Sequence, residues 1–95
     1  MPETIQGTVV SINEAGDLVT DITAERLRGV PRDERVSIRC DDHETNGIFT
    51  TDHNQPESTF LALIGESGYL ELAIVGISAS AMLGIGVGEK VVITW

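Results

Sequence analysis

The chain has 95 residues, and its 6 Lys and Arg against 15 Asp and Glu give a formal net charge of −9. At this length we expect one domain over residues 1–95, too small to wall a deep catalytic cleft alone. The acidic balance argues against nucleic acid and membranes as partners, because phosphate binding needs a basic face. A single cysteine, and residues 1–4 without signal-peptide character, predict a cytoplasmic protein.

The rest of the pattern predicts short strands separated by turns. β-branched residues and apolar–polar alternation mark the strands, and Gly, Pro, Asp and Asn mark the breaks. In chain order the predicted strands are residues 5–12, 18–22, 36–40, 47–51, 59–64, 68–75 and 91–95. The first two should form a hairpin, and alternation places Cys40 in the core. We therefore predict an all-β fold, a small antiparallel barrel of six or seven strands with one or two short helices, whose closure protects apolar edges.

Two short helices and two polar loops complete the prediction. Helix formers after a threonine cap predict little more than one helical turn at residues 23–28, and small residues predict two turns at 77–83. Residues 41–44 and 52–57 are expected to be polar loops. The uncharged run 72–88 is interrupted by glycine and serine, so we expect it not to span a membrane.

Few side chains suggest chemistry by pattern alone. The acidic residues and histidine of segment 41–44 could form a metal site with His53, but their spacing matches no strong motif, and a solvated acidic loop is expected. Neither histidine has a spacing that pairs it with Cys40, so no catalytic residue is assigned. The glycine-rich segment 84–88 precedes a strand, which predicts a turn rather than a phosphate loop. Arginines between residues 26 and 39 alternate with acids, which favours a neutralised surface over an anion site.

Two stretches at opposite ends of the chain carry a family resemblance. Residues 7–12 (GTVVSI) and 16–22 (GDLVTDI) resemble the G-x-V-x-x-I and G-N-L-x-T-N-I runs of the C-terminal domain of S-adenosylmethionine hydroxide adenosyltransferases, relatives of the fluorinase and chlorinase enzymes. Residues 67–73 (SGYLELA), then 78–79 and 83–91, are similar to the same domain's N-S-x-G-Y-L-E-I-A segment, closing small-residue helix and G-D-x-V strand. The resemblance spans nearly the whole chain and implies a β-barrel.

The resemblance implies one half of a two-domain architecture. The family's enzymes resemble trimers whose site lies between one subunit's larger N-terminal domain, which holds the water-activating residues, and a neighbour's C-terminal barrel. By this resemblance the chain would not catalyse alone, and its partner would be a homo-oligomer, a trimer by analogy, or a separate chain. Adenosine or S-adenosylmethionine would be the ligand, with no metal or other cofactor. The ligand-binding residues implied by matching positions are Asp17, Glu66, Ser67, Tyr69, Ser78 and Ala79.

Several positions depart from the family pattern. Asp17 and Asp21 stand where the family has Asn, Glu66 falls at its Asn-Ser pair, and Ala15 replaces an aromatic residue. Carboxylates accept but do not donate hydrogen bonds, and they put negative charge where a ligand carboxylate would lie. Two functions are therefore expected: a non-catalytic structural or assembly domain or, alternatively, an adenosine or S-adenosylmethionine binding module completed by another chain. In the second, Asp17 and Glu71 would accept from the adenine amino group or ribose hydroxyls.

Overall fold

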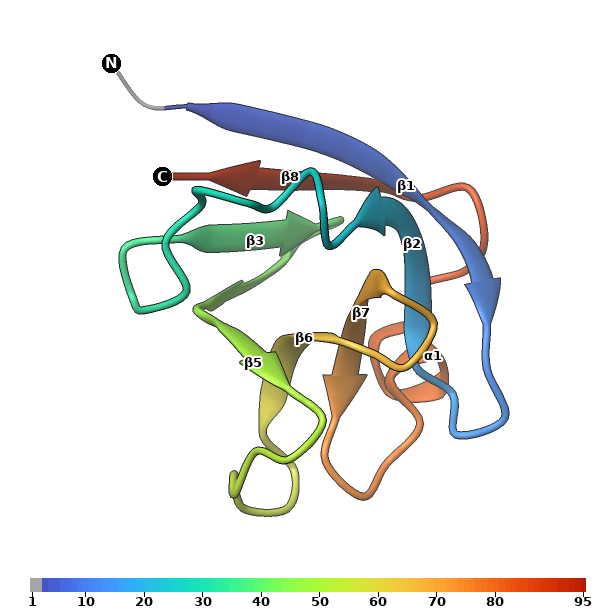
Figure 1. Ribbon diagram of the computed structural model, residues 1–95. Helices are drawn as coiled ribbons and strands as arrows, with labels where there is room; N and C mark the ends of the chain where they lie inside the picture. The colour runs from blue at the N-terminus through green and yellow to red at the C-terminus, as the bar shows by residue number, and fades with distance from the viewer. Residues whose placement is uncertain (1–2) are drawn as a thin grey trace.

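The computed structural model describes residues 3–95, which form eight strands and one short helix (Figure 1). The elements are β1 (Thr4–Ile12), β2 (Leu18–Thr23), β3 (Ser37–Cys40), β4 (His43–Asn46), β5 (Ile48–Thr50), β6 (Phe60–Ile64), β7 (Tyr69–Ile74), α1 (Ala79–Leu83) and β8 (Lys90–Thr94). The predicted all-β barrel is confirmed, but it has eight strands rather than six or seven. The expectation about residues 1–4 falls partly on Met1 and Pro2, which lie outside the described residues.

The strands form one sheet that curls into a nearly closed barrel. Their order is β4-β3-β8-β1-β2-β7-β6-β5, and every neighbouring pair is antiparallel except β5 and β6. The two edge strands, β4 and β5, are consecutive in the chain and are separated only by Gly47, whose φ of +89° bends the backbone. The Thr45 hydroxyl in β4 donates to the Phe60 carbonyl in β6 at 3.1 Å. The bent β4–β5 segment therefore joins the two ends of the sheet and leaves little open edge.

The long strand β1 changes partners along its length. Its first half pairs with β8 and its second half with β2, where a bulge between Val9 and Ser11 shifts the register. Gly7 is needed where β1 passes from one partner strand to the other, because an added Cβ would lie 2.4 Å from Cγ1 of Ile22. Oδ1 of Asp21 accepts from the backbone N–H of Thr8 at 2.9 Å, so this departure from the family pattern holds β1 in place.

Aliphatic side chains fill the barrel, and β7 is buried on both faces. Leu70 and Leu72 point into the main core, while Glu71 and Ala73 on the opposite face are each 7% exposed. A second, outer cluster buries Ala73; it consists of Leu61, Leu63 and Ala73, packed by Phe49 and Val75. The turn at 65–67 covers Glu71. Cys40 is 1% exposed, which confirms its predicted place in the core.

Two local predictions are wrong. Residues 24–29 form successive turns instead of a helix, with hydrogen bonds such as Leu27 N–H to Ala24 O (3.1 Å) that span three residues. Gly29 follows too soon for a helix to continue. The predicted polar loop at 41–44 is a tight turn followed by β4; Asp41 takes a φ of +56°, and Cys40 pairs with His43. Within residues 3–95, no helix is long and apolar enough to cross a membrane.

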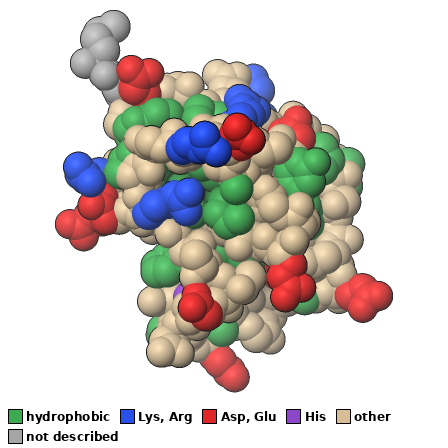
Figure 2. Space-filling view, viewed as in Figure 1, with side chains coloured by type: hydrophobic (Ala, Val, Ile, Leu, Met, Phe, Trp, Pro, Cys, Tyr) green, Lys and Arg blue, Asp and Glu red, His purple; other side chains and the backbone are tan. Residues whose placement is uncertain are grey.

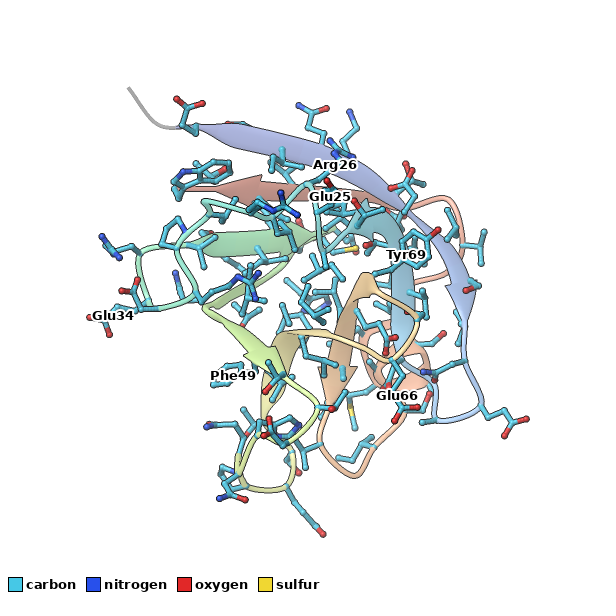
Figure 3. All side chains as sticks on the ribbon, in the orientation of Figure 1. Glu25, Arg26, Glu34, Phe49, Glu66 and Tyr69 are labelled. Atoms are coloured by element: carbon cyan, nitrogen blue, oxygen red, sulfur yellow. The ribbon has the colours of Figure 1, made fainter. Side chains whose placement is uncertain are left out.

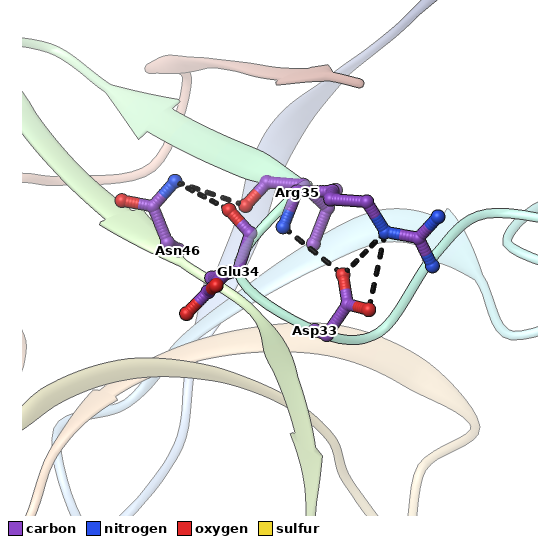
Figure 4. Close-up of polar contacts among 5 residues, drawn as sticks. Asp33, Glu34, Arg35 and Asn46 are labelled. Atoms are coloured by element: carbon purple, nitrogen blue, oxygen red, sulfur yellow. Dashed lines mark hydrogen bonds and ion pairs between the residues drawn. The ribbon is translucent and has the colours of Figure 1, made fainter.

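The basic segment between β2 and β3 is partly neutralised by its own acids. Nε of Arg35 donates to both carboxylate oxygens of Asp33, at 2.9 and 3.1 Å, and this hydrogen bonding lowers the pKa of Asp33 (Figure 4). Arg28 pairs with Glu25 at 3.7 Å. Both pairs are exposed and stabilise the fold little. They agree with the neutralised surface expected for this segment.

Candidate functional site

Two adjoining hollows form one groove on the outer face of β2, β7 and β6. Their volumes are about 510 and 490 Å³, and Asp17, His53 and Leu63 line both. The floor includes a cross-strand row, because Val19 pairs with Glu71 and Glu71 pairs with Leu63. Figure 1 shows the β1–β2 turn, the loop after β5 and the segment after β7 at the same end of the barrel. The groove has the size of a small-molecule site, typically about 300–1,000 Å³.

The β1–β2 turn forms one wall, and Asn13 organises it. Its Oδ1 accepts from the backbone N–H groups of Ala15 and Asp17, at 3.0 and 2.9 Å. Its Nδ2 donates to Oδ2 of Asp17 at 3.2 Å. A side chain that bonds the backbone two residues on is the usual way Asn fixes a turn. The Asp17 carboxylate is thus held at the groove by the turn itself.

The same turn packs against the start of α1. An added Cβ on Gly16 would lie 2.1 Å from Oγ of Ser78, and the Gly16 carbonyl accepts from the Ser80 N–H at 2.9 Å. Ser78 is the N-cap of α1 and accepts from the Ala81 N–H at 3.2 Å. This close contact places Asp17 and Ser78 side by side on the wall of the first hollow.

Glu71 is a buried carboxyl in the floor of the second hollow. Its side chain reaches the turn at 65–67, where Ser67 Oγ donates to Oε2 at 3.1 Å. That position requires Gly65, because an added Cβ would lie 2.0 Å from Oε2. Burial raises the pKa of Glu71; the Ser67 hydrogen bond opposes the rise, and the charges of Asp17 and Glu66 add to it. The carboxyl therefore lies where its ionised form is costly.

His53 supplies an aromatic ring to the opposite wall. Nδ1 accepts from the Gln55 N–H at 3.2 Å, and the ring meets Phe49 edge-on, with centroids 6.3 Å apart. Because Nδ1 accepts this hydrogen bond, a neutral His53 ring carries its proton on Nε2. From the sequence, His53 was considered as a metal ligand and as a partner for Cys40, and this position was missed.

The structure gathers four of the six predicted ligand-binding residues at the groove: Asp17, Glu66, Ser67 and Ser78. Two do not line it. Ala79 is fully buried in the main core, and Tyr69 lies at the first position of β7, opposite Thr23. Figure 3 shows Tyr69 and Glu66 pointing away from each other on either side of the β6–β7 turn. Ligand binding by all six stays a prediction.

The segment at 41–44 is used by the fold. His43 packs edge-on against Phe60, with centroids 6.5 Å apart, and Glu44 accepts from the Ser37 hydroxyl. In the part of the chain that the structure describes, no three His, Cys, Asp or Glu side chains are grouped to hold a metal ion.

Comparison with known proteins relates this fold to one family. The sequence model for the SAM hydroxide adenosyltransferase C-terminal domain matches residues 7–92. An uncharacterized conserved protein from Thermotoga maritima has a similar structure: TM-score 0.77, 20% identity, covering 95% of this chain and 35% of that one. A conserved hypothetical protein from Thermus thermophilus gives 0.68 and 23%, covering 90% and 33%. The chain thus spans about a third of either structure, and these likenesses show the fold alone. A comparison with curated proteins gave no match.

Proposed function

The chain belongs to the family of SAM hydroxide adenosyltransferase C-terminal domains, and from that premise we propose that it is a binding half-site for an adenosine-type ligand. The groove would hold the nucleoside, and a second protein surface would cover it. One observation carries the proposal: four residues at family-matching positions, drawn from three separate segments, converge on one groove.

The lining of the groove suits a nucleoside. Leu63, Val19 and Ala73 offer an apolar floor to a flat base. The His53 ring offers a stacking surface, which Ala15, at the position of the family's aromatic residue, cannot provide. Stacking of a base on an aromatic side chain is worth about 1–3 kcal/mol. The carboxylates at the rim and floor can accept from the adenine amino group and ribose hydroxyls.

The need for a second surface follows from the shape of the groove. Small-molecule sites usually bury roughly 70–90% of the ligand, whereas this groove lies on the outer face of a small barrel and is open to solvent. The proposal assigns binding to this chain and leaves reaction chemistry to whatever covers the ligand. Affinity of the chain alone should therefore be weak.

Titration with adenosine and S-adenosylmethionine, followed by ¹⁵N–¹H NMR, tests the proposal. Backbone amides at Asp17, Ser67 and Ser78 should shift together with one dissociation constant, and His53→Ala should weaken binding about tenfold or more through lost stacking. His43→Ala, at the other histidine, which packs on Phe60 outside the groove, is the matched control and should bind as the wild type does. The proposal fails if no groove amide moves at millimolar ligand.

Assembly is a second candidate function, and exposed apolar side chains favour it. Val10, Met82 and Val87 are 50%, 60% and 64% exposed. Val10 and Val87 lie on neighbouring segments, since the Gly88 N–H donates to the Val9 carbonyl at 2.8 Å. Exposed apolar groups that gather on a surface mark association sites. The partner would be a second copy of this chain; sedimentation equilibrium should show an oligomer that Val87→Asp dissociates, and a strict monomer at all micromolar concentrations would refute the idea.

A further inference from the structure

Charge is distributed unequally between the groove and the rest of the molecule. The groove is lined by three carboxyl groups, Asp17, Glu66 and Glu71, and by no Lys or Arg among the described residues. The basic side chains lie elsewhere, on the segment between β2 and β3 and on the outer face of β3 and β8. In Figure 2 the Lys and Arg side chains gather on the upper part of the visible face. A negatively charged ligand in the groove would meet repulsion with no compensating cation.

The burial and hydrogen bonding of Glu71 add a second observation to its charge. It is 7% exposed, and of its two oxygens only Oε2 has a hydrogen-bond partner, Ser67, within residues 3–95. All fully buried side-chain polar atoms of that range have partners, so Oε1 must be reachable from the groove. Oε1 is thus a free acceptor that faces the groove, and a charged donor on the ligand would form a strong hydrogen bond with it.

We propose that the groove selects a ligand with an organic cation and no carboxylate or phosphate, its ammonium or similar centre seated between Glu71 and Asp17. This inference rests on the proposed function in using the same groove and a nucleoside as the body of the ligand. Among the described residues, the carboxyl groups do not form a compact set of three or more that could hold a metal ion. Their spread along the groove suits an extended organic molecule instead.

Three adenosine derivatives separate the charge of the ligand from its nucleoside body. 5′-Amino-5′-deoxyadenosine carries an ammonium group at neutral pH, adenosine is neutral there, and adenosine 5′-monophosphate is an anion. We expect the amine to bind at least tenfold tighter than adenosine, and the monophosphate to bind more weakly than adenosine. The tenfold preference should shrink as salt is raised from low to physiological concentration, because the carboxylates are partly solvent-exposed.

Variants then assign the preference to the groove. Glu71→Gln and Asp17→Asn, which are close in shape to the native residues, should each reduce the ratio of amine to adenosine affinity. Glu34→Gln removes one charge from the exposed loop before β3 and should leave the ratio unchanged. NMR spectra of the free variants establish that each one folds.

The outcomes distinguish the two proposals. Equal affinity for amine and adenosine overturns the charge inference and leaves the nucleoside half-site standing. Binding of agmatine, a cation without a nucleoside, together with no binding of adenosine overturns the half-site and the nucleoside body of the ligand, and supports only the selection of the groove for an organic cation. Binding of neither nucleosides nor agmatine overturns both. A ratio lowered equally by all three variants overturns the placement of the cation beside Glu71 and Asp17.

Discussion

Replacing Gly16 with alanine tests the contact that builds one wall of the groove. Gly16 has a φ of +86°, a conformation that costs a non-glycine residue about 1–2 kcal/mol. The new Cβ would also lie 2.1 Å from Oγ and 2.7 Å from Cα of Ser78, so the backbone of Ser78 must move as well as its side chain. Overpacking of this kind costs about 1–3 kcal/mol. The two costs together predict a loss of about 2–5 kcal/mol, a large part of the roughly 5–15 kcal/mol that stabilises a typical domain.

Gly68→Ala is the matched control for this prediction. Gly68 has nearly the same φ, +84°, but an added Cβ there meets nothing within 4 Å. It should therefore lose only the conformational part, about 1–2 kcal/mol. Urea unfolding followed by the fluorescence of Trp95, the only tryptophan, measures both variants. If the two variants lose equal free energy of unfolding, the turn does not pack on Ser78 and the wall of the groove is wrongly placed.

Four further predictions concern single side chains. Thr20→Val should destabilise by about 1–3 kcal/mol in urea unfolding, because the buried hydroxyl donates to the Leu70 carbonyl at 2.7 Å. Ser78→Ala removes the N-cap of α1 and should cost about 0.5–2 kcal/mol, measured the same way. Burial raises the pKa of Cys40 to about 11, so Ellman's reagent near neutral pH should react only with unfolded protein, and fast labelling of the native state would contradict this. Burial raises the pKa of Glu71 above its ordinary 4.5. The stability that this carboxyl group contributes is therefore present below pH 4.5 and is lost as the pH rises through the folded-state pKa. Thermal unfolding should show Glu71→Gln to be more stable than the wild type at neutral pH but not in acid.

Most of the fold was predictable because the buried strands have clear local patterns. The alternation in β2 and β3 and the β-branched density of β1 follow directly from one face being packed on a core. The strand β4 carries no such signal, since its sequence HETN is polar throughout. It is a strand because β3 offers it a hydrogen-bonding edge and because Asp41 adopts the left-handed backbone conformation that the turn requires. Neither feature can be read from the local sequence. Its direct continuation into the parallel strand β5 through Gly47 has no local signal either.

The candidate site divides in the same way. Motif positions identified Asp17, Glu66, Ser67 and Ser78, which the structure gathers at the groove. The alternation of β7 places Glu71 on the face opposite Leu70, where the pattern alone would leave its side chain exposed. The turn at 65–67 covers it instead, and no local pattern reports contacts made by a turn with the middle of the following strand. His53 escaped prediction for a related reason, because a loop histidine acquires its neighbours only when the loop folds back over the sheet.

Coverage of the groove by a second protein surface and binding of a positively charged ligand are coupled energetically. A second surface that closes over the groove removes water from Asp17, Glu66 and Glu71, and burying a charge without a partner is costly. Glu71, already largely buried, can respond by protonation, but the exposed Glu66 would lose more of its hydration than it has lost in the open barrel. A cation in the groove offsets these costs, so it should bind more tightly to the covered groove than to the open one, and by reciprocity it should strengthen the covering contact. Sedimentation of this chain with and without 5′-amino-5′-deoxyadenosine measures that coupling where a second copy of the chain is the covering surface. If an oligomer forms and the amine leaves the association constant of the oligomer unchanged, binding of the cation and coverage of the groove are independent.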